Sequence, residues 1–424
     1  MRVLLVGGGG REHALAWKLA QSPRLDRLIA APGNPGLARH AECVAIKDSA
    51  IDDLVALAGR ESADLVVVGP ELPLSLGLAD RLRDAGRAVF GPSQAAARLE
   101  SSKAFAKDLM ARYGIPTARF ETFQDAAAAR RFCRDLGAPL VVKTDGLAAG
   151  KGAIVCPTLD DADRAIRLCL EDGAFGEAGR TVVVEEFMEG EEASFFVITD
   201  GASALPFQAA QDHKTIFDGD RGPNTGGMGA YSPAPVLDAA AERRVMEEIV
   251  MPTIAAMAKE GAPYAGVLYI GLMLTRQGSR VVEFNCRFGD PECQAIVPRL
   301  EDDILPLFDA VARGRGLPAR LRWRAESSVC VVLASHGYPG PPRSGDRIGG
   351  LAAAEALPGV NVFHAGTAIR DGEVVTAGGR VLGVQALGSD IRAAITLAYD
   401  AVGRIRFDGM QWRSDIGRRA LDRG

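Results

Sequence analysis

Two polar side chains in one late segment have the spacing and chemistry to bind a divalent cation. Residues 281–287 read Val-Val-Glu-Phe-Asn-Cys-Arg. Strand side chains alternate between faces, so Glu283, Asn285 and Arg287 should share one face. A carboxylate and an amide oxygen suit Mg²⁺, which takes one or two protein oxygens plus nucleotide phosphates, and Arg287 could clamp a carboxylate or phosphoryl group. An amphipathic strand with a solvated face is the alternative, but Asn is uncommon in strands.

A glycine-rich turn follows a lysine in residues 143–152, which read Lys-Thr-Asp-Gly-Leu-Ala-Ala-Gly-Lys-Gly. The turn is not a Walker motif, because Asp145 stands where glycine is required and Gly152 where Ser or Thr is required. A flap of small residues can still fold over a triphosphate and offer backbone N–H groups. A surface hairpin is the alternative, but it would not explain two lysines and three glycines so close together. We therefore predict phosphate binding here.

Three further segments are candidate ligand sites. The run at Gly7–Gly10 lacks the third glycine of a dinucleotide fingerprint, which disfavours a nicotinamide cofactor. It could hold a phosphate at a helix N-terminus or be a plain tight turn. The strand at 182–188 leads into carboxylates and suits a purine and its ribose, although charged residues after a strand are usually solvated. The polar, glycine-rich loop at 211–229 could hold a small substrate such as an amino acid, and His213 within it is more typical of a structural histidine.

The elements that must position these groups follow from the apolar pattern. Alternating short strands and helices, with turns at the strand ends, predict a parallel, doubly wound sheet over residues 1–100. Ligands bind at such carboxyl-terminal turns. The later part predicts strands at 140–144, 181–185, 194–199, 267–274 and 280–285, helices at 103–113, 160–171 and 240–259, and little regular structure over 211–235. A small mixed α/β domain should follow a boundary near 313–328, with strands near 329–334, 373–376 and 380–386 and a helix near 389–403.

Composition excludes several classes of protein. The 424 residues carry a formal net charge of −5, which argues against a general electrostatic grip on nucleic acid. The seven cysteines are scattered without a CxxC pair, which indicates reduced thiols rather than zinc ligands. No apolar run approaches the roughly 18 residues of a membrane span. We expect a soluble, cytoplasmic, monofunctional protein that acts on small molecules, binds neither membrane nor nucleic acid, and is a monomer.

The motifs, taken in order, resemble the ATP-grasp superfamily and, within it, the glycinamide ribonucleotide synthetase family. The matching segments span nearly the whole chain: 9–14, 31–34, 68–71, 102–105, 145–152, 211–214, 222–233 and 283–292. Gly8, Thr144 and Cys293 differ from the residues usual in that family. The resemblance implies an α/β fold with an N-terminal doubly wound domain (1–100), central ATP-grasp domains (101–320, with a flap subdomain at about 120–190) and a C-terminal mixed α/β domain (325–424).

The resemblance also implies roles for individual residues. ATP, the substrate nucleotide, should contact Lys103, Lys143, Gly146, Gly150, Lys151, Gly152, Glu185, Glu186, Phe187, Met188 and Glu192. Glu283 and Asn285 should bind Mg²⁺ or Mn²⁺. Glycine and 5-phosphoribosylamine should contact Gly9, Gly10, Asn34, Glu71, Asp212, Lys214, Asn224, Thr225, Gly226 and Arg287, with Arg287, Lys143 and Asp212 catalytic.

The implied reaction joins glycine to the amine through glycyl phosphate in de novo purine synthesis. Three alternatives stay open: another ATP-grasp ligase or carboxylase using an acid such as bicarbonate, a nicotinamide-dependent oxidoreductase built on residues 1–100, and a non-catalytic nucleotide sensor. No biotin-type carrier segment is apparent, which favours the glycine ligase.

Overall fold

The computed structural model describes residues 1–148 and 152–423. Its N-terminal part is a five-stranded sheet in the order β3-β2-β1-β4-β5, in which all neighbouring strands are parallel. The strands are β1 (Arg2–Gly7), β2 (Arg27–Pro32), β3 (Glu42–Cys43), β4 (Leu65–Val68) and β5 (Ala88–Phe90). The helices are α1 (Gly10–Leu19), α2 (Ile51–Arg60), α3 (Glu71–Ser75), α4 (Leu78–Asp84) and α5 (Gln94–Ser101). The sheet's winding reverses at β1 and β4, and the turns after those two strands are where ligands of such sheets bind.

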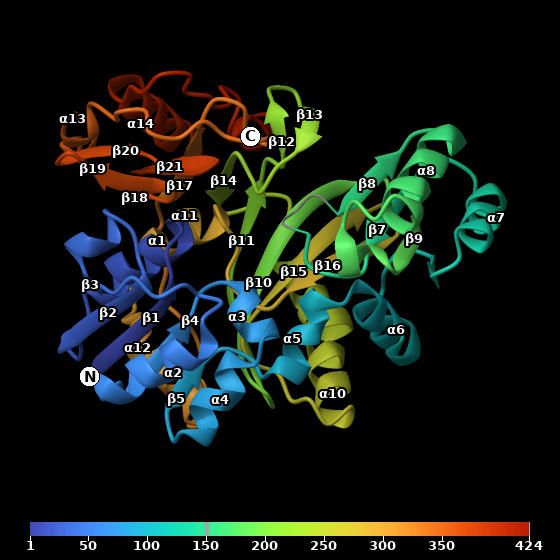
Figure 1. The fold of residues 1–424 in the computed structure, drawn as a ribbon, viewed down its shortest axis with the longest axis horizontal. Helices are drawn as coiled ribbons and strands as arrows, with labels where there is room; N and C mark the ends of the chain where they lie inside the picture. The colour runs from blue at the N-terminus through green and yellow to red at the C-terminus, as the bar shows by residue number, and fades with distance from the viewer. Residues whose placement is uncertain (149–151, 424) are drawn as a thin grey trace.

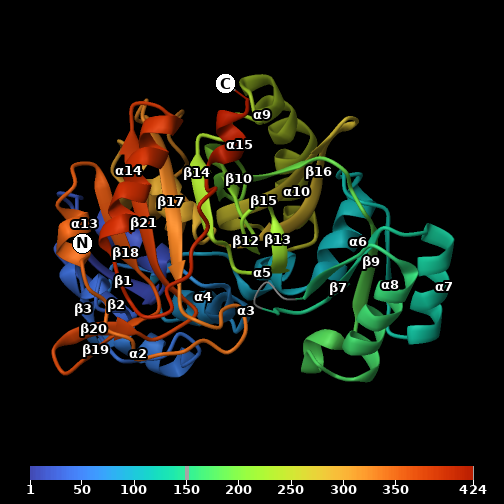
Figure 2. The same ribbon diagram turned by 90° about the horizontal axis from the view of Figure 1, so that it is seen from above.

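A second unit projects from the body as an arm, seen at the right in Figures 1 and 2. It is a four-stranded antiparallel sheet in the order β6-β9-β7-β8, covered by two helices. Its elements are β6 (Phe120–Phe123), α7 (Ala126–Leu136), β7 (Leu140–Thr144), β8 (Ala153–Cys156), α8 (Leu159–Ile166) and β9 (Val182–Glu186). Helix α6 (Lys103–Tyr113) joins the arm to the N-terminal part. It is capped by Ser102, whose hydroxyl accepts a hydrogen bond from the backbone N–H of Phe105.

The largest sheet has eight strands in the order β16-β15-β10-β11-β14-β17-β21-β18. Its strands are β10 (Glu191–Asp200), β11 (Ala204–Asp212), β14 (Gly229–Ser232), β15 (Ala265–Thr275), β16 (Gly278–Asn285), β17 (Ser327–Ala334), β18 (Val360–His364) and β21 (Arg380–Gly388). Because β14 pairs with β17, the central region and the C-terminal region share one sheet. One cluster of buried apolar side chains runs from Val66 of β4 to Leu268 of β15, so the N-terminal and central regions also share a core.

Helices and two hairpins complete the molecule. The remaining helices are α9 (Ala239–Val245), α10 (Met251–Lys259), α11 (Glu292–Ile296), α12 (Ile304–Ala312), α13 (Leu351–Glu355), α14 (Ile391–Arg404) and α15 (Arg418–Leu421). The hairpins are β12 (Thr215–Phe217) with β13 (Arg221–Asn224), and β19 (Thr367–Arg370) with β20 (Glu373–Thr376). Among the described residues, no helix is both long and apolar enough to cross a bilayer.

The predicted fold class is confirmed, including the N-terminal parallel sheet and the C-terminal mixed α/β region. The prediction of little regular structure over 211–235 is wrong, because β12, β13 and β14 lie there. The segment 240–259 is helical, but a π-helical turn at Met246–Val250 separates α9 from α10. Pro252 follows that turn and has no N–H to donate, which accounts for the departure from regular α-helix at this point.

Candidate active site

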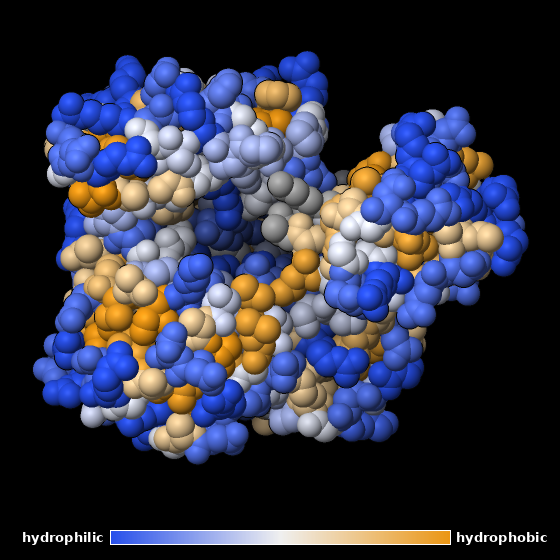
Figure 3. Space-filling view, viewed as in Figure 1, coloured by the Kyte–Doolittle hydropathy of each residue, from blue (hydrophilic) through white to orange (hydrophobic). Residues whose placement is uncertain are grey.

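A cavity of about 610 Å³ lies where the N-terminal region, the arm, the large sheet and the C-terminal region meet. Figure 3 shows the hollow in this face of the molecule, with hydrophilic residues at its floor. The predicted residues that line it are Glu71, Lys103, Lys143, Glu185, Glu186, Phe187, Met188, Glu192, Asp212, Lys214, Asn224, Thr225, Gly226, Glu283, Asn285 and Arg287. Predicted ATP, metal and substrate residues from distant parts of the chain therefore converge on one cavity.

Two lysines share one buried carboxylate at the arm end of the cavity. Glu185 of β9 lies 3.0 Å from the ammonium of Lys143 and 3.1 Å from that of Lys107 on α6. Lys143 also donates to the carbonyl of Val282 (2.9 Å), which ties the arm to β16. Burial lowers the pKa of Lys107 to about 8, against the opposing effect of Glu185. The result is a buried group of two cations and one anion, and its net positive charge suits phosphate oxygens.

Lys103 differs from its two neighbours because, within the part of the chain that the structure describes, it has no ion pair. Its ammonium contacts the carbonyl of Gly146 at 3.4 Å, and Gly146 begins the glycine turn. Burial lowers the pKa of Lys103, while Glu283 opposes that shift. A half-buried ammonium without a counter-ion among the described residues is well placed to receive an anion.

Glu283 and Asn285 of β16 both reach the cavity, and neither side chain makes a hydrogen bond to another described residue. Burial opposes ionisation of Glu283, but the charges of Lys214, Lys143 and Lys103 outweigh it and lower its pKa. No group of three His, Cys, Asp or Glu side chains among residues 1–148 and 152–423 is placed to hold an ion. One carboxylate and one amide oxygen left open fit a cation that takes its remaining ligands from nucleotide and water.

Arg287 is held between two acids of the N-terminal region. Its guanidinium lies 3.1 Å from Glu71, at the start of α3, and 2.7 Å from Glu100 on α5. Burial opposes ionisation of Glu71, but Arg287 and Arg11 outweigh it and bring its pKa to about 2. For Glu100 burial prevails and raises the pKa. Arg287 is thus oriented by an ionised carboxylate at the cavity wall before any ligand arrives.

Asp212 and Lys214 occupy the opposite wall, at the end of β11. Lys214 pairs with Glu192 of β10 at 2.9 Å. Burial, together with the charges of Glu292 and Glu192, raises the pKa of Asp212 to about 7 in spite of Lys214. A carboxylate with that pKa can take up a proton near neutral pH, as a general base requires.

The loop after β13 is fixed by contacts with itself and with the C-terminal region. The Thr225 backbone N–H and hydroxyl both donate to the Lys214 carbonyl at 2.7 Å. The Gly226 N–H donates to the hydroxyl of Tyr338 at 2.9 Å, and Arg380 of β21 donates to the Gly226 carbonyl. The C-terminal region therefore contributes to the cavity wall and orients the loop there.

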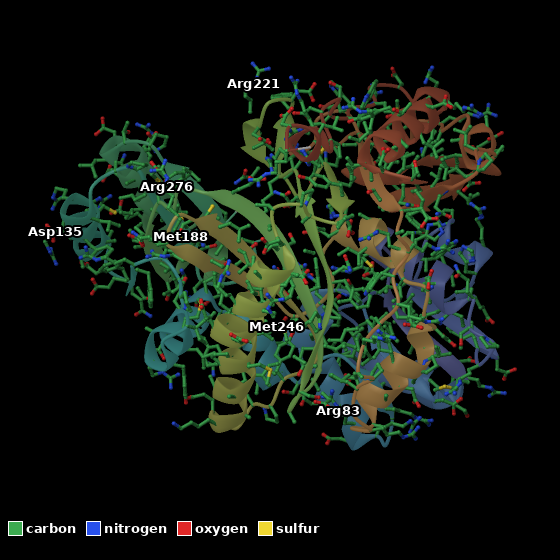
Figure 4. All side chains as sticks on the ribbon, turned by 180° about the vertical axis from the view of Figure 1, so that it is seen from behind. Arg83, Asp135, Met188, Arg221, Met246 and Arg276 are labelled. Atoms are coloured by element: carbon green, nitrogen blue, oxygen red, sulfur yellow. The ribbon has the colours of Figure 1, made fainter. Side chains whose placement is uncertain are left out.

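Phe187 and Met188 follow β9 as a short extended segment. Among the described residues, neither backbone N–H has a hydrogen-bond acceptor. Figure 4 shows Met188 between the arm and the large sheet. Free backbone groups beside apolar side chains are what a purine edge requires.

Sequence comparisons match family profiles over most of the chain. The phosphoribosylglycinamide synthetase N domain matches residues 1–100, the ATP-grasp (A) domain residues 101–293 and the C domain residues 328–419. The chain belongs to the phosphoribosylglycinamide synthetase family. The family predicted from the motifs is therefore confirmed.

Members of the phosphoribosylglycinamide synthetase family match along their whole length. A phosphoribosylamine–glycine ligase of Brucella melitensis is 52% identical, covering 100% of this chain and 99% of that protein. One from Caulobacter vibrioides is 54% identical, with 99% of both chains covered. The crystal structure of the Thermotoga maritima phosphoribosylamine–glycine ligase aligns with a TM-score of 0.86 at 31% identity, covering 98% of this chain and 100% of that one.

Campylobacter jejuni biotin carboxylase, in complex with an ATP analogue, aligns with a TM-score of 0.75 at 18% identity, covering 97% of this chain and 92% of that one. That likeness shows a shared fold.

Within this phosphoribosylglycinamide synthetase fold, five predicted residues lie outside the cavity wall. Asn34 uses its side chain within the protein: it donates to the carbonyls of Gly8 and His364 and accepts from the N–H groups of Gly36 and Leu37, all at 2.9 Å. The others are Gly9, Gly10, Gly146 and Gly152. Gly9 lies next to the cavity, because a Cβ there would be 3.4 Å from Asp290, which lines it. Gly150 and Lys151 lie outside the described residues.

Several residues that line the cavity were not predicted from the sequence. Lys107 stands four residues after Lys103, one helical turn along the same face of α6, and this spacing could have revealed it. Arg11 and Glu292 lie in segments that carried the family resemblance. Glu100, Tyr338 and Arg380 gave no signal, because only the tertiary fold brings them to the site.

Proposed function

We propose that this protein joins glycine to 5-phosphoribosylamine with ATP, giving glycinamide ribonucleotide, ADP and phosphate through glycyl phosphate, in de novo purine synthesis. The observation that carries the proposal is the open Glu283–Asn285 pair, which shares one cavity with Lys103, Lys143 and the segment 185–188. The full-length match to ligases of that name supports the same reaction. We place the enzyme in the cytoplasm, as a monomer.

ATP would lie between the arm and the large sheet. The adenine would meet the backbone of Phe187 and Met188, beyond Glu185 and Glu186, and its ribose would contact Glu192. The phosphates would lie against Lys103 and Lys143, under the glycine turn from Gly146 to Gly152. Residues that cover the phosphates would exclude water from a site where the acyl phosphate must not hydrolyse. Gly150 and Lys151, two further proposed ATP contacts, lie outside the described residues.

Glu283 and Asn285 would hold Mg²⁺ or Mn²⁺, which neutralises the charge of the phosphates. Their oxygens have no hydrogen-bond donor within residues 1–148 and 152–423, and the lowered pKa of Glu283 keeps it ionised at neutral pH. Arg287, fixed by Glu71, adds a second positive charge near the place where glycine's carboxylate attacks the γ-phosphate. In this way the chain supplies position and charge rather than a covalent nucleophile.

The second step needs an amine nucleophile and a proton acceptor. The nitrogen of phosphoribosylamine attacks the carbonyl carbon of glycyl phosphate; the C–N bond forms, the C–O bond to phosphate breaks and phosphate leaves. Asp212 accepts the proton that the nitrogen loses, which its raised pKa permits. Lys214 and the loop at Asn224–Gly226 would orient glycine. The backbone of the turns at Gly9–Gly10 and Asn34 would hold the ribose phosphate, and Glu71 would contact the sugar rather than the phosphate, because it is ionised.

Turnover of the purified protein tests the proposal. ADP release should require glycine, phosphoribosylamine and a divalent cation together, and bicarbonate should not replace glycine. Glycine labelled with ¹⁸O in its carboxylate should transfer one label to the phosphate released, because that oxygen bridges the acyl phosphate. ADP release without glycine, or phosphate free of label, would contradict the proposal. Glu283→Ala is the matched inactive control.

A further inference from the structure

The β12–β13 hairpin stands apart from the three larger sheets, between two cavity-lining stretches of chain. Lys214 lies immediately before the hairpin, and Thr225 lies immediately after it. The two stretches are joined at the hairpin's base, where Thr225 donates twice to the Lys214 carbonyl. Any change in the hairpin's orientation therefore moves residues on the cavity wall.

Residues 413–419, near the C-terminus, bind this hairpin through the side chain of Arg413. The Arg413 side chain is 1% exposed, and its guanidinium donates to Asp415 at 2.7 Å through two nitrogens. A third nitrogen reaches the hairpin, at 2.9 Å from the hydroxyl of Thr215 and 3.0 Å from Asp220. A planar fork that satisfies several acceptors at once is specific to arginine.

Further contacts join the same two segments. The N–H of Gly219 donates to Asp415 at 2.8 Å, and the N–H of Ser414 donates to Asp218 at the same distance. Arg419 pairs with Asp220 at 2.7 Å. Strand β12 and the tip of the hairpin are thus attached to a segment about 200 residues later in the chain.

The same cluster reaches the chain beside Asp212. Arg419 lies 3.4 Å from the carbonyl of Asp212. The next residue, His213, is buried, and burial together with the charges of Arg419 and Arg413 lowers its pKa to about 3. Asp212 and Lys214 line the cavity, while His213 between them responds to the charged cluster behind it.

We propose that Arg413 is a positioning residue for glycine: it acts from outside the cavity by holding the β12–β13 hairpin, and through it Lys214 and Thr225, in place. The proposal rests on the proposed function, because glycine is assigned to that loop. The contacts of residues 413–419 with the hairpin are called the brace below. The proposed ATP residues lie in the arm, on α6 and on β10, and none of them is on the hairpin; one of them, Glu192, pairs with Lys214. The brace should therefore affect glycine far more than ATP.

The variant Arg413→Ala tests whether Arg413 holds the β12–β13 hairpin in place, and Arg347→Ala is the matched control. Arg347 is in the same C-terminal region but its ion pair with Glu373 is solvent-exposed. We expect Arg413→Ala to lower kcat/KM for glycine by about 10- to 100-fold, because small misplacements of a positioning group cost that much, and to leave the KM for ATP within twofold of wild type. Arg413→Lys should recover only part of the loss, since an ammonium cannot form the fork.

A second readout does not depend on turnover. Arg221, labelled in Figure 4, lies at the outer end of the hairpin, and its exposed peptide bond to Gly222 is a trypsin site. Mass spectrometry should show faster cleavage after Arg221 in Arg413→Ala than in wild type or Arg347→Ala. If Arg413→Ala does not fold, Asp220→Asn replaces it: Asp220 has φ 55°, which Asn tolerates, and it is the hairpin's own partner for Arg413.

The outcomes separate the two proposals. Unchanged cleavage after Arg221 overturns the brace, whether or not the wild type is a ligase. Faster cleavage with glycine kinetics within twofold of wild type overturns the positioning role. A parallel loss for glycine and ATP indicates a general structural defect and also overturns it. A wild type without glycine-dependent turnover refutes the proposed function, while trypsin still decides whether Arg413 holds the hairpin.

Discussion

Glu185→Gln removes the only anion from the buried group formed with Lys107 and Lys143. Glu185 is 2% exposed and lies about 3 Å from both ammonium groups. Breaking a buried ion pair by deleting one partner typically costs about 3–5 kcal/mol, because the other charge stays desolvated. We expect Glu185→Gln to lower the free energy of unfolding at pH 7 by about 3 kcal/mol.

The pH dependence of this loss in the free energy of unfolding shows how much of it comes from the ion pair between Glu185 and Lys107. Its folded pKa of about 8 is below its ordinary value, so the unfolded state binds more protons above pH 8 and wild-type stability rises with pH there. Without Glu185 the pKa falls further, and Lys107 releases its proton at lower pH. At pH 7 the wild-type pKa of about 8 lies one unit above the pH, and one unit corresponds to about 1.4 kcal/mol. The part of the stability loss that comes from protonated Lys107 is therefore about 1.4 kcal/mol at pH 7 and close to zero at pH 9.

Urea unfolding at both pH values measures the effect. The deficit of Glu185→Gln relative to wild type should shrink by about 1.4 kcal/mol between pH 7 and pH 9. Glu186→Gln is the control: its partly exposed pair with Arg280 should contribute at most about 1 kcal/mol, without this pH dependence. A deficit below about 1 kcal/mol at pH 7, or one equal at both pH values, would refute the reasoning.

Three further predictions concern catalysis. Glu283→Gln should lower kcat at least roughly 100-fold and raise the Mg²⁺ requirement, since metal charge stabilisation is worth several kcal/mol; activity at normal Mg²⁺ levels would contradict it. In wild type, kcat/KM for phosphoribosylamine should rise with pH through about 7 as Asp212 loses its proton, and Asp212→Asn should be slow and lack this inflection. Lys143→Ala should raise the KM for ATP and lower kcat, measured beside the surface control Lys259→Ala; unchanged kinetics would mean that the nucleotide lies elsewhere.

The parallel sheet could be predicted because each of its strands has a local sequence signal. Leu65–Val68 is a short apolar run that ends in Gly-Pro, and all four residues are buried. β14 gave no such signal: Gly229–Ser232 lies in a glycine-rich stretch. It is a fully buried strand because β11 and β17 pair with it on both sides. Pairing partners distant in sequence outweigh local propensity there.

The site was predictable where side chains follow strand periodicity and not where charges pair across regions. Alternation predicts that Glu283 and Asn285 share a face, and both line the cavity, as do Val282 and Phe284 beside a register shift in the β15–β16 pairing. The same rule applied to β9 separates Glu185 from Glu186: the first meets Lys107 and Lys143, while the second meets Arg280. Sequence order does not show which cation each acid finds, because those lysines come from α6 and β7.

These pairings change what ligand binding must accomplish. Lys143 and Lys214 already have carboxylate partners in Glu185 and Glu192, so an incoming triphosphate or glycine exchanges one anion for another. Lys103 has no such partner among the described residues and offers its full charge from the start. Lys143 is already buried, while Lys103 and Lys214 are only partly buried, so the gain on binding comes from better geometry, from the metal's added charge and from fuller burial of those two ammonium groups. The acids that stabilise these cations before ATP binds therefore also limit how tightly the site holds ATP in the absence of a divalent cation.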